Sequence, residues 1–292
     1  MDSATCPAPE VSVIIPARNE ARRIGRVIQE ARRVSPLTEV IVVCNGVTDH
    51  TTKLALENGA RVIEAAPSLG HDVGRAVGAF FARGDVMLFI DADFLVPAFK
   101  LRRYVDEVKK GWDVVLNAYS GYQSKRSINP TSLAKRLLNH IVGRPDLVGS
   151  SLTTVPHAMS RLAAERIGFE ELAVPPKAQV KAVLQGLTIT RVCPINTARL
   201  NDPRIGRKDR VVDLVLGDHA EAIAAYLREK GERAGFFDQE RNRDLLLFPP
   251  QQHLRTVYRQ ETIRATGGSW RDGGKAKQKT RHKTGPKTRR PR

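Results

Sequence analysis

The sequence predicts an α/β fold in which helices flank a mostly parallel β-sheet. Apolar, β-prone segments alternate four times with helix-like segments before residue 112, and this alternation is typical of βαβ units with right-handed crossovers. Residues 86–90 are five consecutive apolar residues, and so short a run indicates a strand that is buried on both faces. Polar turns follow several of these strands, at the strand ends where open α/β sheets bind their ligands.

The first half of the chain supplies five of the expected strands. They are residues 11–16, 39–43, 60–64, 86–90 and 113–116, with helices after the first four that begin near residues 20, 50, 73 and 97. In the first helix the apolar residues recur at i, i+3, i+4 and i+7, as in an amphipathic helix that covers a sheet. We expect Asn19 to cap this helix and Glu20 to lie in its first turn.

The second half has a looser pattern. We expect helices that begin at Asn129-Pro130, with proline in the first helical position, and at Pro175-Pro176. We expect strands at residues 152–155 and 187–192. Asp218 is placed to cap a last helix that runs from His219 to about residue 230.

Composition indicates a globular protein of a reducing compartment. Hydrophobic residues make up 41% and charged residues 27% of the 292, as in ordinary globular domains. Cys6, Cys44 and Cys193 are too few and too scattered for a disulfide framework or a zinc site. No signal peptide and no uninterrupted apolar stretch of membrane-spanning length are visible. We therefore expect a cytoplasmic protein.

The positive charge is concentrated at the C-terminus. Residues 271–292 contain ten Lys and Arg and one acid, so they carry +9 of the total +17. Clustered like charges and few aromatic residues are typical of disordered segments. We expect this tail to be disordered and to attach the protein to an anionic membrane surface or another polyanion; a merely solubilising tail is the alternative.

Asp91 and Asp93 follow the buried strand at residues 86–90. Side chains alternate along a strand, so the two carboxylates are expected on one side and Ala92 on the other. Two adjacent carboxylates repel each other, and a hard divalent cation offsets that repulsion. This pair could hold Mg²⁺ or Mn²⁺ against a diphosphate. A solvated turn rich in aspartate is the alternative.

Four segments together resemble the family 2 glycosyltransferases. VSVIIPARNE, VVCNGVTDHT, GHDVGRAVGAFFARGD and FIDADF occur in the order and spacing of that family, and the match covers residues 11–94. The resemblance implies the Rossmann-like GT-A fold and an enzyme that transfers a sugar from a nucleoside-diphosphate donor, with Mn²⁺ or Mg²⁺. It implies a nucleotide-sugar half at 1–117 and an acceptor half of the same domain at 118–270, followed by the tail at 271–292.

The resemblance also implies roles for particular residues. Pro16, Ala17, Arg18, Asn19 and Glu20, together with Asn45 and Gly46, would contact the base and ribose, Gly70 and Arg75 would lie near the diphosphate, Asp91 with Ala92 would approach the ribose, and Asp91 and Asp93 would hold the metal. A metal and an arginine stabilise the charge that develops as a nucleoside diphosphate leaves. Each residue has a plainer alternative: Asn45 as a turn former, Asp49 as a helix cap, Arg75 as a solvated helix residue.

The sequence departs from the family pattern at two places. Cys44 stands where an acid is common, which leaves the base specificity open. Val174 and Pro175 stand where the family commonly has a Glu-Asp pair that supplies the general base, and neither can take a proton. Replacement candidates are Glu170, Glu171, His157, Asp218 and His219. We expect His219, at a helix start, to be a third metal ligand or the base; an exposed histidine beside a helix cap is the alternative.

Two other functions compete with glycosyl transfer. An aspartate-dependent phosphotransferase would use Asp91 as nucleophile and Asp93 as acid, but that class has a hydroxyl residue shortly afterwards, and here Phe94 and Leu95 follow. A non-catalytic protein that binds sugar nucleotides or polyanions would explain the missing base. The sugar, the acceptor and the stereochemical outcome stay open.

Overall fold

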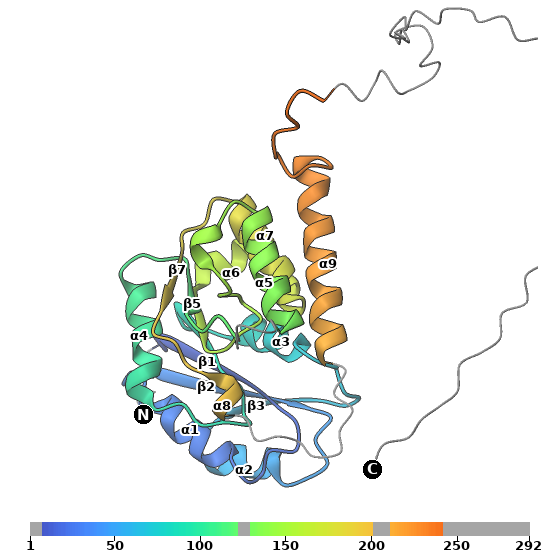
Figure 1. Ribbon diagram of the computed structural model, residues 1–292. Helices are drawn as coiled ribbons and strands as arrows, with labels where there is room; N and C mark the ends of the chain where they lie inside the picture. Colours follow the sequence, from blue (N-terminus) through green and yellow to red (C-terminus); the bar gives the residue numbers. More distant parts are fainter. Residues whose placement is uncertain (1–7, 122–128, 201–210, 242–292) are drawn as a thin grey trace, which may run out of the picture. The chain divides into compact units, whose positions relative to one another are not determined.

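The chain folds around one seven-stranded mixed sheet (Figure 1). The computed structural model describes residues 8–121, 129–200 and 211–241. The strand order is β3-β2-β1-β4-β6-β5-β7. Strand β6 runs antiparallel to both of its neighbours, β4 and β5, and the other pairs are parallel. The predicted α/β class with a mostly parallel sheet is therefore confirmed.

The strands are short, and most of those in the first half agree with the predicted segments. They are β1 (Val11–Ala17), β2 (Thr38–Asn45), β3 (Arg61–Ala65), β4 (Val86–Phe89), β5 (Val114–Asn117), β6 (His157–Ser160) and β7 (Ile189–Val192). The helices are α1 (Ile24–Arg32), α2 (Thr51–Glu57), α3 (Val73–Phe81), α4 (Ala98–Lys109), α5 (Pro130–Ile141), α6 (Arg161–Ile167), α7 (Pro175–Leu184), α8 (Thr197–Leu200) and α9 (Val211–Lys230), with 3₁₀ turns η1 (Pro145–Leu147) and η2 (Phe169–Ala173).

Helix α3 packs unusually close to the sheet. A Cβ atom on Gly78 would lie 2.4 Å from Cγ2 of Ile14 in β1, and one on Gly74 would lie 3.1 Å from Cβ of Pro16. A larger residue at Gly78 would force the helix away from the strand. The two glycines therefore bring the first turn of α3, which carries Arg75, to the carboxyl ends of β1 and β2.

Helices α5, α7 and α9 pack together around a second, smaller apolar cluster, and Figure 1 shows α9 alongside α5. Its buried members are Leu138, Val142, Val180, Ala222 and Tyr226. Helix α5 begins as predicted, with Pro130 in its first turn and the Asn129 side chain accepting a hydrogen bond from the Thr131 N–H.

Three predicted local features are wrong. Residues 152–155 form turns, and the strand begins at His157, where antiparallel pairing with Phe89 of β4 starts; the next residues of β6 pair with the preceding residues of β4 and with β5. Helix α1 begins at Ile24, later than predicted, so Asn19 does not cap it and Glu20 precedes its first turn; the Asn19 side chain bonds to Thr48. His219 is not at a helix start, because α9 already begins at Val211.

The chain divides into two compact units, Met1–Phe237 and Asp238–Arg292. The sheet and all the described helices belong to the first unit. Of the second, the structure describes residues 238–241, where Arg241 pairs with Asp238. The predicted basic tail at 271–292 lies outside the described residues, and the boundary at residue 117 stays a prediction. Within the described ranges, no helix is both long and apolar enough to cross a membrane.

Candidate functional site

The turns after β1 and β2 are bonded to each other at the carboxyl end of the sheet. The Asn19 side chain donates to Oγ1 of Thr48 at 3.0 Å and accepts from the Thr48 N–H at 2.8 Å. The buried Glu20 N–H donates to Oγ1 of Thr51 at 2.7 Å. Pro16 and Ala17 end β1 beside this junction, and the Arg18 side chain is exposed. The structure thus brings residues 16–20 together with the second turn.

Asp49 also belongs to this junction. It accepts hydrogen bonds from the N–H groups of Ala21 and Thr51 and from the Thr51 hydroxyl. Burial acts to raise the pKa of Asp49, but these hydrogen bonds outweigh it and lower the pKa below its usual value. The structure therefore gives Asp49 a local, structural role.

Asn45 holds the loop between β3 and α3. Its side chain donates to the Gly70 carbonyl at 2.6 Å and accepts from the Leu69 N–H at 2.5 Å. Gly46 has φ of +61°, and a Cβ atom there would lie 2.8 Å from Cβ of Ser68. Asn45, Gly46 and Gly70 are thus brought together. Asn45 is buried, and both the nitrogen and the oxygen of its side-chain amide are hydrogen-bonded within the protein.

A chain of charged side chains connects this loop with β4. Nδ1 of His71 lies 2.9 Å from Oδ2 of Asp72, Asp72 pairs with Nη1 of Arg75, and Nη2 of Arg75 donates to Oδ1 of Asp91 at 2.9 Å. Arg75 is 6% exposed, so the alternative of a solvated helix residue is wrong. Among the described residues, its Nε has no hydrogen-bond partner.

Asp91 and Asp93 lie just beyond β4, which ends at Phe89, rather than on the strand itself. Burial still alternates as expected: Ala92 is buried, whereas Asp91 and Asp93 are partly exposed. Within residues 8–121, 129–200 and 211–241, no three His, Cys, Asp or Glu side chains are grouped closely enough to hold a metal ion. Asp91, Asp93 and His219 are therefore not brought into one cluster.

His157 comes from the second half of the chain to the same edge of the sheet. It pairs with Phe89 across β6 and β4 and stacks on that ring at 4.8 Å between centroids. Burial, helped by the nearby positive charge of Arg75, lowers the pKa of His157 to about 3. The ring is neutral at physiological pH and packs in the core.

His219 lies in the middle of α9 and is 2% exposed. Its Nδ1 donates to the Val215 carbonyl at 2.6 Å, and its Nε2 is buried with no hydrogen-bond partner among the described residues. Burial is the main cause that lowers the pKa of His219 to about 4. The pKa of the preceding residue, Asp218, is raised by burial and by the nearby Glu221. His71 is close enough to Asp218 to act in the opposite direction.

The other candidates for the missing base, Glu170 and Glu171, lie in η2, just before α7. Val174 and Pro175 stand at the start of α7, as predicted. Glu171 pairs with Lys177 at 3.3 Å and with Lys181 at 3.4 Å. Glu170 is exposed in η2.

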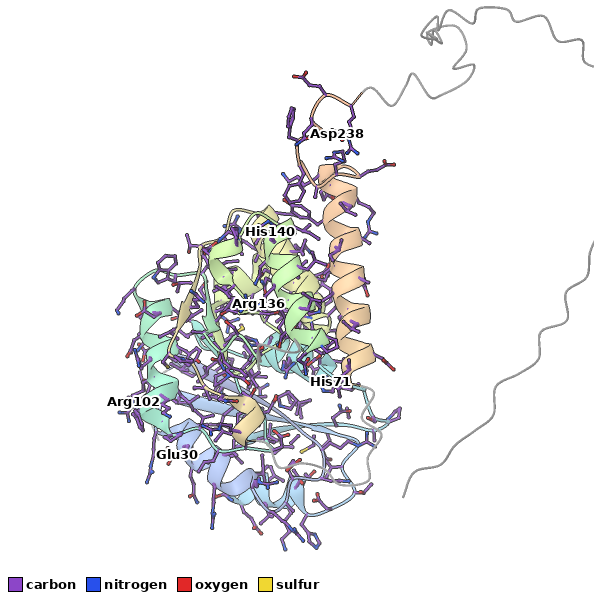
Figure 2. The ribbon with its side chains drawn as sticks, viewed as in Figure 1. Glu30, His71, Arg102, Arg136, His140 and Asp238 are labelled. Atoms are coloured by element: carbon purple, nitrogen blue, oxygen red, sulfur yellow. The ribbon has the colours of Figure 1, made fainter. Side chains whose placement is uncertain are left out.

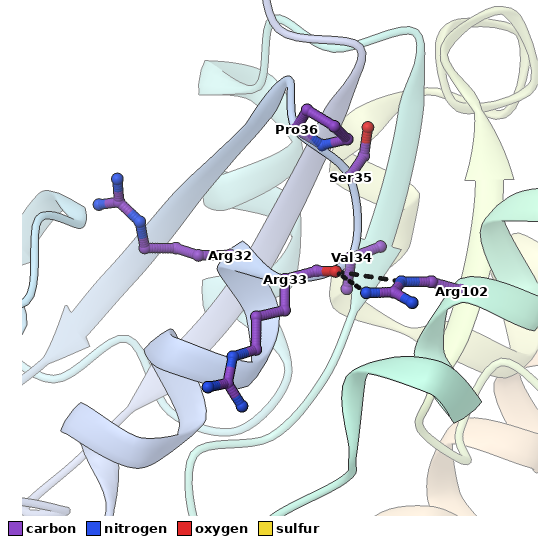
Figure 3. A pocket seen from close by; sticks show the side chains of 6 residues that line it. All are labelled: Arg32, Arg33, Val34, Ser35, Pro36 and Arg102. Atoms are coloured by element: carbon purple, nitrogen blue, oxygen red, sulfur yellow. Dashed lines mark hydrogen bonds between the residues drawn. The ribbon is translucent and has the colours of Figure 1, made fainter.

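A shallow hollow of about 320 Å³ lies elsewhere, beside the amino end of β2 (Figure 3). Its lining residues are Arg32, Arg33, Val34, Ser35, Pro36 and Arg102. The arginines are already engaged: Arg102 donates to the Arg33 carbonyl, Arg33 pairs with Glu30, and Arg32 donates to the Gly59 carbonyl. β2 carries Asn45 at its opposite end, so this hollow is separate from the strand-end site.

The family model described as "Glycosyl transferase family 2" matches residues 12–168. This range is more than half of the 292 residues. The chain belongs to glycosyl transferase family 2. Both the resemblance seen in the four motifs and the predicted GT-A type of fold are confirmed.

Curated relatives match parts of this family 2 chain. It is 24% identical over 175 residues to a 4,4'-diaponeurosporenoate glycosyltransferase of Staphylococcus haemolyticus. This match covers 57% of this chain and 44% of the relative. It is 35% identical over 101 residues to a glucosyl-3-phosphoglycerate synthase of Mycolicibacterium paratuberculosis. This second match covers 30% of this chain and 29% of the relative. The chain thus spans less than half the length of these relatives.

Solved structures support the fold over a longer range. The structure of glucosyl-3-phosphoglycerate synthase from Mycobacterium tuberculosis in complex with Mn²⁺, UDP and phosphoglyceric acid superposes with a TM-score of 0.55 at 22% identity. The match covers 79% of this chain and 80% of that one. At this identity the likeness shows the fold alone.

Sequence reasoning missed three residues that shape the site. Asp72 orients Arg75, Thr154 accepts from Lys135, and Asn117 joins the ends of three loops through bonds to Val155 and Ile195. Asp72 directly precedes α3, and a carboxylate at a helix start was a usable signal. Lys135 and Thr154 are 19 residues apart, and no periodicity connects them.

Proposed function

We propose that this chain transfers a sugar from a nucleoside-diphosphate donor to an acceptor, assisted by Mn²⁺ or Mg²⁺. The observation that carries the proposal is the buried Arg75 bonded to Asp91 at the carboxyl end of β4, with Asp93 two residues further on, in a family 2 chain. The relatives that bear sugar-transferring names and the Mn²⁺ and UDP in the superposed structure support it.

The donor set suits a hard cation only if the substrate completes it. Asp91 and Asp93 offer carboxylate oxygens, which Mg²⁺ and Mn²⁺ prefer. The described residues hold no cluster of three metal ligands. Mg²⁺ is often bound by one or two carboxylates together with substrate phosphates, so a diphosphate would supply the remaining ligands. We place His219 outside this set. When bound, the cation would neutralise the charge of the departing diphosphate.

Protein residues would fix the donor around that cation. Arg75, held between Asp72 and Asp91, places a fixed positive charge next to the proposed diphosphate position, where negative charge develops during transfer. The cross-linked turns at residues 16–20 and 45–46 would form the wall against the base and ribose. Cys44 is buried, and burial raises the pKa of its thiol, so it would not contact the base as a charged group.

A second candidate function follows from Val174 and Pro175, which stand where the family commonly has a Glu-Asp pair. Pro175 is buried at the start of α7 and cannot accept a proton. A chain that binds a sugar nucleotide without transferring the sugar would have this arrangement. Retaining transfer, which would need no base at Val174 or Pro175, would have it too.

Hydrolysis of sugar nucleotides separates these functions. UDP-sugars and GDP-sugars are incubated with the protein, with and without Mn²⁺, and release of the nucleoside diphosphate is measured. Metal-dependent release that Asp93→Asn abolishes supports the transferase. Tight metal-dependent binding without release supports the binding protein. Absence of both binding and release would overturn the proposal.

A further inference from the structure

Lys135 in α5 is a partly buried cation that no acid compensates within the described residues. Its ammonium donates to Oγ1 of Thr154 at 2.6 Å, and no ion pair of Lys135 occurs there. Burial alone lowers the pKa of Lys135 to about 8, with no contribution from a neighbouring carboxylate. Placing an ammonium out of water without a counter-charge is costly, so a residue kept in this state has a use for an anion.

His219 in α9 provides a second unsatisfied group beside it. Helix α9, which carries His219, packs against α5, which carries Lys135. The charge of Lys135 also contributes, after burial, to the lowered pKa of His219, so the two side chains lie within electrostatic range of each other. Because Nδ1 carries the proton that bonds to Val215, Nε2 is an unprotonated acceptor, and it is buried without a partner among the described residues. A buried acceptor of this kind suits a hydroxyl donor.

The third member, Thr154, is fixed by a buried polar network. Asn139 donates to the carbonyls of Val148 and Ser150 at 3.0 Å, and Gln179 accepts from the Leu152 N–H at 3.0 Å. Gln179 and Asn139 also bond to each other at 2.6 Å. The loop before β6 is therefore held in one position between α5 and α7, and Thr154 with it.

This cluster adjoins the donor site along two routes. Thr154 bonds through its carbonyl to His157, whose neighbour across the sheet is Phe89, two residues before Asp91. Asp218, next to His219, lies close to His71, and Figure 2 shows His71 near the end of α9. These contacts link the cluster to the end of β4 that leads to Asp91 and to the loop that carries His71.

We propose that Lys135, Thr154 and His219 bind an acceptor that carries both an oxyanion and a hydroxyl group. Lys135 and Thr154 take the phosphate or carboxylate oxygens, and Nε2 of His219 accepts a hydrogen bond from the hydroxyl. Calling the ligand the acceptor rests on the proposed function; the oxyanion site itself does not.

Binding of small phosphates tests the site by isothermal titration, with and without UDP and Mn²⁺ to fill the donor position. The probes are inorganic phosphate, methyl phosphate, glycerol 3-phosphate and a short prenyl monophosphate. Lys135→Met should weaken binding at least about tenfold, because charge-assisted hydrogen bonds are lost. Lys100→Met, an exposed lysine of α4, is the matched control and should change nothing.

The probes also distinguish the source of the phosphate. Glycerol 3-phosphate binding more tightly than methyl phosphate, with an advantage that His219→Phe removes, indicates a soluble hydroxylated acceptor. Tighter binding of the prenyl phosphate indicates a lipid phosphate. If no probe binds the wild type, or if Lys135→Met binds as the wild type does, the proposal is overturned.

Stability provides an independent readout. Lys135→Met removes a partly buried ammonium that has no acidic partner within the described residues, so the midpoint of thermal unfolding of this variant should rise by a few degrees. A lower midpoint would show that the protein itself compensates Lys135 and would contradict the argument. If that variant does not fold, Thr154→Val removes the hydroxyl at nearly constant volume, and unchanged phosphate affinity in it would overturn the site. Phosphate binding that depends on Lys135 in a chain that binds neither UDP nor GDP would overturn the proposed function and leave the site standing.

Discussion

The two sides of the site differ in how their polar groups are satisfied. On the side of β1, β2 and β4, the polar side chains are mostly bonded to one another, as in the series from His71 through Arg75 to Asp91. On the side of α5 and α9, Lys135 has one neutral partner, and Nε2 of His219 has none within the described ranges. Satisfied networks rigidify a site before a ligand arrives.

This difference fits a division of labour between donor and acceptor. A nucleoside diphosphate presents the same groups whichever sugar it carries, so a preorganised wall of fixed dipoles and charges suits it. An acceptor that is recognised by its own charge and hydroxyl must find groups that the protein has left unpaired. The family motifs accordingly fall on the side whose polar groups are mostly bonded, where Nε of Arg75 is an exception among the described residues. Lys135 and His219 fall where no family motif was recognised.

The largest expected effect concerns the side of β1, β2 and β4. Asp72→Asn removes the charge that Arg75 faces while keeping a residue that tolerates the left-handed backbone at this position, where φ is +61°. Breaking a buried ion pair leaves an uncompensated charge, so we expect a loss of about 3 kcal/mol in the free energy of unfolding. Urea denaturation measures it.

Glu57→Gln is the matched control for that variant. Its pair with Lys53 is exposed and 3.9 Å long, and pairs of this kind contribute less than about 0.5 kcal/mol. Equal losses of unfolding free energy in the two variants would mean that the Asp72–Arg75 pair stabilises the fold no more than an exposed pair does.

The next effect concerns the donor. Asp93→Ala should weaken Mn²⁺-dependent binding of UDP or GDP by about a hundredfold while the fold stays intact, because a metal with few protein ligands loses one of them. Calorimetric titration measures the affinity, and far-UV circular dichroism checks the fold. Wild-type affinity in this variant would remove Asp93 from the proposed metal set.

The sequence was sufficient for the first half because its strands are continuous apolar runs. The predicted segment at 86–90 corresponds to Val86–Phe89, and the one at 39–43 to Thr38–Asn45. Such runs are recognisable because both faces are buried. The positions of Asn45 and of the Asp91–Asp93 pair follow from the same logic, since parallel strands end at one edge.

The second half could not be predicted in the same way. Strand β6 has four residues, and its pairing with β4 and β5 defines it more than its composition does. The predicted helix from His219 begins too late, because α9 runs from Val211 through Gly217. A glycine inside a helix costs only about 1 kcal/mol, so it does not end one. The buried residues Val215, His219, Ala222 and Tyr226 of α9 recur at helical spacing, and that stripe was the available signal.

A smaller effect is expected from pH, and it concerns the buried imidazoles on both sides. The folded-state pKa values of His157 and His219 are about 3 and about 4, below the ordinary 6.5. Below pH 6.5 these two histidines bind protons in the unfolded chain but stay unprotonated in the folded chain until the pH is much lower. Each buried histidine should therefore lower the free energy of unfolding by up to about 2 kcal/mol between pH 6.5 and pH 5.

Denaturation at several pH values measures that slope. His157→Gln should flatten the dependence between pH 5 and 6.5, whereas His50→Gln, at an exposed position of the second turn, should leave it unchanged. A wild-type slope in His157→Gln would show that the imidazole is not held neutral by its burial against Phe89.

The smallest effect on turnover is expected from the tail, which belongs to neither side of the site. A chain that ends at Trp270 loses the +9 of residues 271–292 and keeps every residue proposed here for donor and acceptor. Its rate of sugar-nucleotide turnover should match that of the full chain. Its binding to vesicles that contain anionic lipid should weaken, with the largest difference at low ionic strength, because contacts between basic side chains and anionic lipid are screened by salt and release counterions. Flotation of both chains with vesicles at about 50 and about 300 mM salt measures the binding.

Equal flotation of the two chains at low salt would mean that the tail only keeps the protein in solution. A fall in the turnover of the shortened chain would place part of the tail in the site.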